Sequence, residues 1–173
     1  MTVLGADYRR ELGVSRYPML VYVLAPLVAL VLQAWLPWLL RGYAWFDLPL
    51  VVTVYFALAR RDAIQGTLMG AGMGLFEDAL TTHAIGVNGV AKTVAGFLAG
   101  SMGVRIDVED HTVRLVLTFL LSLLSSAIYV FIFRILLGLE LDWRWLVELV
   151  KAGINTLIAL VLFHLLDRLK ITD

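Results

Sequence analysis

The first long apolar stretch of this chain, from Pro18 to Leu40, contains no charged residue over 23 positions. About 20 apolar residues in a helix, rising about 1.5 Å per residue, span the hydrocarbon core of a bilayer. Hydrophobic residues make up 61% of the sequence, against about 45–50% in soluble domains. A cleaved signal peptide fits poorly, because residues 1–16 precede the stretch and it exceeds the usual signal core of about 7–15 residues. The chain is therefore predicted to be an integral membrane protein.

Six apolar segments follow one another along the chain, at residues 17–40, 46–59, 63–80, 87–104, 112–138 and 146–167. They predict an all-α integral membrane protein with six transmembrane helices in a single domain, residues 1–173, whose residues 1–16 form an N-terminal tail. The second segment has only 14 residues between its polar bounds, Asp47 and Arg60. Because it is marginal for a full span, we expect it to lie in a locally thin region or to be extended by neighbouring turns.

The Lys and Arg residues on the two sides predict the orientation, because cytoplasmic loops carry an excess of them; Lys92, Arg134 and Lys151 are left out, since they fall within helices or at their ends. With the N-terminus inside, the outer side holds two of them, Arg41 and Arg144. The cytoplasmic side then holds nine: Arg9, Arg10, Arg16, Arg60, Arg61, Arg105, Arg114, Arg168 and Lys170. The asymmetry predicts that both the N-terminus and the C-terminus are cytoplasmic.

Glycines recur at four-residue spacing in the third and fourth segments, and each series leads to a charged residue. The series are Gly66, Gly70 and Gly74 before Asp78, and Gly96 and Gly100 after Lys92. Residues four apart share one face of a helix, and small residues let membrane helices approach closely. The spacing predicts two antiparallel helices packed glycine to glycine, with an Asp78–Lys92 ion pair near one membrane face. We interpret this pair as structural rather than as part of an ion path.

Glu77 and Lys151 are two further charged positions in or beside the apolar segments. Glu77 precedes Asp78 and lies about 100° round the helix, so it is expected to face another helix or the outer headgroup region. Lys151 follows Glu148 by three residues and precedes Asn155 by four. This polar face could line an outward-facing pocket, but we favour a lysine that reaches the membrane interface.

Hydroxyl groups form a stripe on the fifth segment at Ser122, Ser126 and Tyr129. Serines in membrane helices usually hydrogen-bond to neighbouring backbone or helices. We interpret this stripe as a packing surface between helices.

Motifs for catalysis, metal binding and nucleic-acid binding are missing from the sequence. The chain has no cysteine, and His83, His111 and His164 are far apart in the predicted topology. Neither HExxH nor GxSxG occurs. The glycines from Gly70 to Gly74 lack a third glycine at the spacing that a dinucleotide site requires, and no βαβ unit surrounds them. The formal net charge of zero gives no basic surface for nucleic acid. We expect a protein that is not an enzyme and has no cofactor or metal.

Part of the sequence resembles the rod shape-determining protein MreD family. A third helix with spaced glycines that ends in acidic residues, followed by a glycine-containing turn into the fourth helix, is similar to that family. The short entry to the second helix, Asp47–Pro49, also resembles it, and the clear similarity covers about 60 residues. The residues that carry it, with those that extend its glycine series, are Gly66, Gly70, Gly74, Glu77, Asp78, Gly86, Asn88, Lys92, Gly96 and Gly100.

The resemblance implies a non-enzymatic component of the bacterial cell-elongation machinery, which builds peptidoglycan and maintains rod shape. Such a protein would lie in the inner membrane as a scaffold and partner of MreC. RodA, a class B penicillin-binding transpeptidase and, indirectly, MreB would be further partners, and membrane lipid would surround it.

The alternative is a small-molecule-binding membrane subunit of an energy-coupling-factor type transporter, because the MreD family is similar in architecture to those six-helix substrate-binding subunits. Ala25 and Ala29 would suit docking to a transporter scaffold. The connection between the first two segments is short, however, and would leave a ligand without a lid. The scaffold interpretation is therefore favoured.

Overall fold

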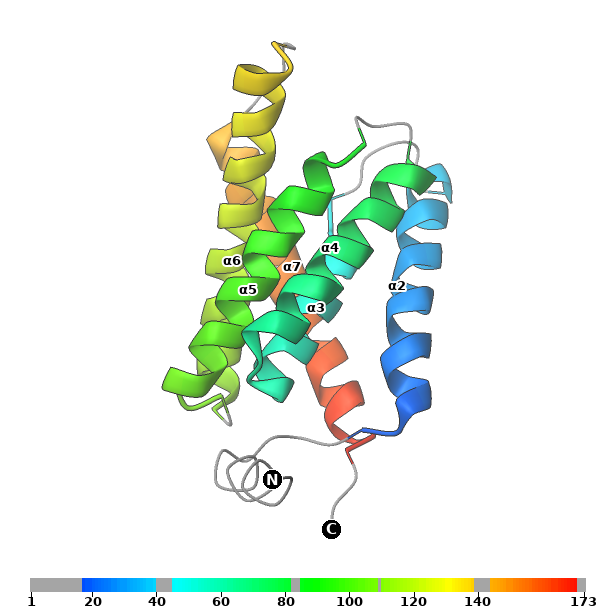
Figure 1. The fold of residues 1–173 in the computed structure, drawn as a ribbon, viewed down its shortest axis with the longest axis vertical. Coiled ribbons are helices and arrows are strands. Elements are labelled where there is room, and N and C mark those ends of the chain that lie inside the picture. Colours follow the sequence, from blue (N-terminus) through cyan, green and yellow to red (C-terminus); the bar gives the residue numbers. More distant parts are fainter. Residues whose placement is uncertain (1–16, 40–44, 82–84, 109, 139–143, 171–173) are drawn as a thin grey trace.

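The computed structural model describes residues 17–39, 45–81, 85–108, 110–138 and 144–170, and all elements within these ranges are helices. They pack as a bundle (Figure 1). Their bounds follow the predicted apolar segments closely: α2 (Met19–Leu39), α3 (Leu48–Arg60), α4 (Ala63–Leu80), α5 (Val87–Arg105), α6 (His111–Phe131) with its π-helical continuation η1 (Ile132–Leu136), and α7 (Trp145–Asp167). The N-terminal tail predicted at residues 1–16 lies outside the described residues.

Three of these helices are long and apolar enough to cross a membrane: α2, α6 together with η1, and α7. Their outward faces carry leucine, valine and phenylalanine side chains, among them Leu27, Val31, Leu120 and Leu157. Helix α3 is apolar but has only 13 residues. Helices α4 and α5 have 18 and 19 residues. Their glycines and charged residues make them less apolar than the three helices named above. The architecture indicates a membrane protein.

The short helix α3 forms the centre of the bundle. Its 13 residues are packed on all sides by other helices. All its residues from Pro49 to Ala59 are buried, and it contacts α2, α4, α5, α6 and α7. Asp47 caps its first turn by accepting a hydrogen bond from the backbone N–H of Leu50 at 2.9 Å. Arg61 ends it in the left-handed conformation, with φ 51°. Because other helices surround α3, its side chains contact protein rather than the outer surface of the bundle.

Helices α4 and α5 pack antiparallel and form the most extensive helix pair of the bundle. The glycine stripes meet as the spacing predicts, with the backbones of Gly66 and Gly96 in direct contact. Gly70 lies against the backbone of Lys92, and Gly74 against that of Asn88. A Cβ atom at Gly70 would lie 2.6 Å from the carbonyl carbon of Lys92. The two backbones therefore approach at a distance that only glycine permits.

Candidate functional site

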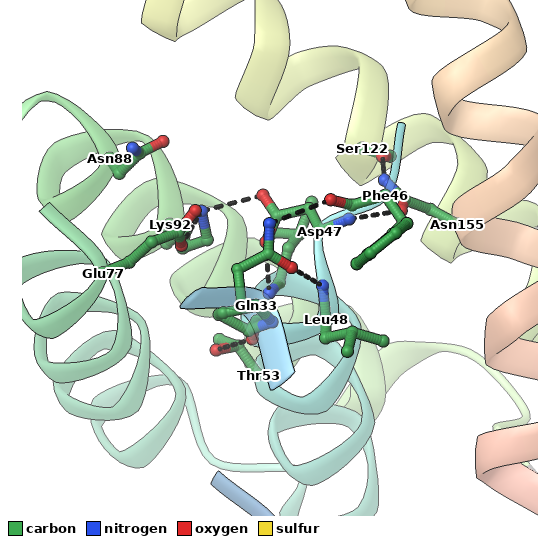
Figure 2. Close-up of polar contacts among 12 residues, drawn as sticks. Gln33, Phe46, Asp47, Leu48, Thr53, Glu77, Asn88, Lys92, Ser122 and Asn155 are labelled. Atoms are coloured by element: carbon green, nitrogen blue, oxygen red, sulfur yellow. Dashed lines mark hydrogen bonds and ion pairs between the residues drawn. The ribbon is translucent and has the colours of Figure 1, made fainter. Parts of the chain in front are cut away.

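Lys92 is the most deeply buried charge among the described residues, with an exposed fraction of 0%. Its Nζ lies 2.8 Å from Oδ2 of Asp47 and 2.7 Å from Oε2 of Glu77. The three side chains come from α5, from the residue before α3 and from the last turn of α4, and they converge in Figure 2. A buried ammonium is tolerated when carboxylates neutralise it. This ion cluster ties three helices together at one end of the bundle.

Asp78 does not pair with Lys92, so the predicted Asp78–Lys92 ion pair was wrong. Its Oδ2 accepts hydrogen bonds from the backbone N–H groups of Gly86 at 2.8 Å and Gly89 at 3.2 Å. Its Oδ1 accepts one from the side-chain amide of Asn88 at 2.8 Å. Neighbouring helical residues point about 100° apart, so Glu77 faces Lys92 while Asp78 faces the turn. Asp78 therefore caps the start of α5.

Gly86 has a conformational role in this turn. Its φ of 99° lies in the region that glycine adopts and other residues avoid. This backbone turn directs the N–H groups of Gly86 and Gly89 toward the Asp78 carboxylate. The sequence resemblance includes Gly86 and Asn88 as part of this turn. Both residues belong to the cap of α5.

Gln33 holds the start of α3 from the neighbouring helix, and the sequence analysis missed it. Its side-chain nitrogen donates to the carbonyl of Phe46, and its side-chain oxygen accepts from the N–H of Leu48, both at 3.1 Å (Figure 2). Asn155 accepts a hydrogen bond from the N–H of Asp47 at 2.7 Å. Gln33 is the only side-chain amide in the uncharged run from Pro18 to Leu40, and that isolation was a signal for a buried polar contact.

A cavity of about 420 Å³ lies beside this cluster, lined by residues of α2, α3, α4, α5, α6 and α7 and by the residues just before α3. Lys151 lines it and forms an ion pair with Glu148 at 2.8 Å. The side chain turns along α7 toward Glu148 and is still 38% exposed, so its expected reach to the membrane interface stays a prediction. The polar face of α7 lines a pocket, which was the alternative interpretation.

The serine stripe on α6 has both a packing and a lining role. Ser122 accepts a hydrogen bond from the side-chain amide of Asn155 at 2.6 Å, and Ser126 donates one to Glu148. Both bonds join α6 to α7, as the packing interpretation predicts. Ser122, Ser126 and Tyr129 also line the cavity, which that interpretation did not include.

The opposite end of the bundle has a second cluster of polar side chains, around Asp167. Its carboxylate accepts a hydrogen bond from the Tyr55 hydroxyl at 2.7 Å and pairs with Arg114 at 2.8 Å and Lys170 at 2.9 Å. Tyr17 and Tyr55 share a further hydrogen bond at 2.6 Å. Each partner is satisfied within the protein, so these contacts fasten α3, α6 and α7 together.

Among the described residues, no group of three or more His, Cys, Asp and Glu side chains could hold a metal ion. His83 lies outside the described residues. Comparisons of the chain with family models, with curated proteins and with solved structures found no match.

Proposed function

We propose that this chain is a non-enzymatic scaffold of the bacterial cell-elongation machinery, located in the inner membrane and bound to MreC. RodA and a class B penicillin-binding transpeptidase are further proposed partners, and MreB is an indirect one. In this proposal the six helices all span the membrane, with both termini in the cytoplasm. The role is to hold the partners in a fixed arrangement.

The observation that supports this proposal most is that the residues resembling MreD form one connected network. The glycines bring the α4 and α5 backbones together, and the carboxylates at the end of α4 bond to α5 and to the turn before it. Asp47, from the second matching stretch, reaches the same buried Lys92. A sequence motif that specifies a rigid junction of three helices suits a scaffold, because a scaffold needs a fixed shape rather than a reactive group.

Reporter fusions test the proposed topology. A fusion after residue 173 is expected to give a cytoplasmic signal, and an insertion between residues 79 and 88 a periplasmic signal. The physical reason is the excess of Lys and Arg on the side that includes Arg60 and Arg61. A periplasmic signal from the C-terminal fusion would contradict the six-helix arrangement.

Co-purification tests the proposed partner. The full chain, tagged at its C-terminus and extracted from native membranes in mild detergent, is expected to carry MreC as a major partner in mass spectrometry. Depletion of the chain should make rod-shaped cells round. Gly72→Ala is the control variant for both measurements, because a Cβ at Gly72 would meet nothing within 4 Å. Recovery without MreC, together with normal cell shape after depletion, would contradict the proposal.

A transporter subunit that binds a small molecule is the second candidate, and the cavity of about 420 Å³ favours it. The two alanines expected to dock a transporter scaffold are not on an open surface, and this argues against the transporter function. Ala29 is 4% exposed and packs in the core, and Ala25 is partly buried against the same cluster. Co-purification of a transporter scaffold, in place of MreC, is the result that would favour this function.

A further inference from the structure

The ion cluster beside the cavity contains two carboxylates for one ammonium group. Asp47 and Glu77 share Lys92, at 2.8 Å and 2.7 Å. Both carboxylates belong to residues that line the cavity. The other charges in the lining, Glu148 and Lys151, neutralise each other as an ion pair. With ionised side chains, the cavity and its ion cluster therefore lack one positive charge, in a site where unbalanced charge is costly.

The contacts within the cluster leave hydrogen-bonding capacity. Oε2 of Glu77 and Nζ of Lys92 are both buried and 2.7 Å apart, yet within the described residues neither atom has a partner aligned as a hydrogen bond. Glu77 thus has its charge partly balanced but still has lone pairs available. The enclosed Oε2 faces Lys92, whereas Oε1 has no hydrogen bond among the described residues and is the oxygen that a donor in the cavity would meet.

Ser125 provides an independent observation on the same cavity. It lines the cavity and is only 5% exposed, but its hydroxyl has no hydrogen-bond partner among the described residues. The neighbouring Ser122 and Ser126 hydroxyls are both bonded to α7. Buried hydroxyls in proteins are normally satisfied. The Ser125 oxygen is not among the fully enclosed atoms without a partner, so it opens on the cavity, where a polar group of a ligand would bond to it.

The rest of the cavity lining defines the size and character of that ligand. About 420 Å³ lies in the range of small-molecule sites, which is about 300–1,000 Å³. Trp45, Phe46 and Leu50 are among the residues that line it, and an aromatic face attracts an ammonium group. A divalent metal ion is a poor fit, because no cluster of three metal-ligating side chains occurs among the described residues.

We propose that this cavity binds a primary ammonium group on a small amphiphilic molecule. Asp47 and Glu77 supply the counter-charge, Ser125 accepts one of the ammonium hydrogens, and the aromatic residues of the lining contact the apolar part. A free alkylamine and the ethanolamine headgroup of a phospholipid share this chemistry. The site is independent of the proposed scaffold function, because it rests on the cavity and not on any partner protein.

Two binding measurements on the purified full chain test the site and identify the source of the ammonium group. In phosphatidylcholine nanodiscs, n-hexylamine is expected to bind at least about tenfold more tightly than n-hexanol, which has the same apolar body without the charge. In native mass spectrometry, selective retention of phosphatidylethanolamine over phosphatidylcholine would identify a lipid headgroup. Hexylamine binding without lipid retention would identify a free amine. Equal affinity for hexylamine and hexanol, with no lipid preference, would overturn the proposal.

Two matched serine variants test the residues. Ser125→Ala removes the unpartnered hydroxyl and is expected to weaken hexylamine binding by about threefold to tenfold. Ser101→Ala is its control, because Ser101 is a partly exposed residue of α5 that donates to the carbonyl of Phe97 and is absent from the cavity lining. Glu77→Gln should remove the preference for hexylamine over hexanol. Unchanged binding in Ser125→Ala, or an equal loss in Ser101→Ala, would show that the amine binds elsewhere.

Discussion

Gly70→Ala is expected to cause a large loss of folded protein, although it adds only one methyl group. The new Cβ would lie 2.6 Å from the carbonyl carbon of Lys92 and 3.0 Å from the backbone nitrogen of Thr93. Backbone atoms of a packed helix cannot move aside as a flexible side chain can, so α4 and α5 must separate. Overpacking of this kind costs about 3 kcal/mol. The measurement is the free energy of unfolding in mixed detergent and SDS, followed by circular dichroism.

Gly72→Ala is the matched control on the same helix. A Cβ at Gly72 would meet nothing within 4 Å, and alanine favours the helix over glycine by about 0.8–1.0 kcal/mol in peptides. We therefore expect unchanged or slightly increased stability. Equal destabilisation by the two substitutions would show that the loss comes from helix propensity or lipid contact, and not from the packing of α4 against α5.

Lys92→Met is expected to have the second large effect. The substitution keeps most of the side-chain volume but leaves the carboxylates of Asp47 and Glu77 together without their cation. Removing one member of a buried ion pair costs about 3–5 kcal/mol, because the remaining charge is buried without a partner. Lys151→Met is the comparison, since that lysine is partly exposed and pairs with Glu148 one turn away. It should lower the free energy of unfolding by less than about 1 kcal/mol.

Double-mutant cycles distinguish the observed partner of Lys92 from the predicted one. Lys92→Met combined with Glu77→Gln should destabilise less than the sum of the single substitutions, because the charge imbalance is partly relieved. Lys92→Met combined with Asp78→Asn should be close to additive, since Asp78 bonds to the start of α5. Strong coupling to Asp78 and none to Glu77 would contradict the arrangement in Figure 2.

The sequence alone determined the helices and one of their contacts. Six apolar segments predicted the bounds of the helices to within a few residues, because apolar length and polar interruptions limit where an apolar helix begins and ends. The four-residue spacing of Gly66, Gly70 and Gly74 predicted which face of α4 meets α5. The prediction of this face succeeded because residues four apart lie on one side of a helix, and this holds for any arrangement of the other helices.

Only the tertiary structure decided which groups meet at the polar site. The partner of Lys92 depended on the rotation of α4, which turns Glu77 rather than Asp78 toward it. It also depended on Asp47, which comes from a segment that no local spacing connects to α5. Gln33 and the cavity required the positions of several helices at once. Local patterns determine faces and ends of helices, whereas the distance between side chains on different helices is set by how the bundle packs as a whole.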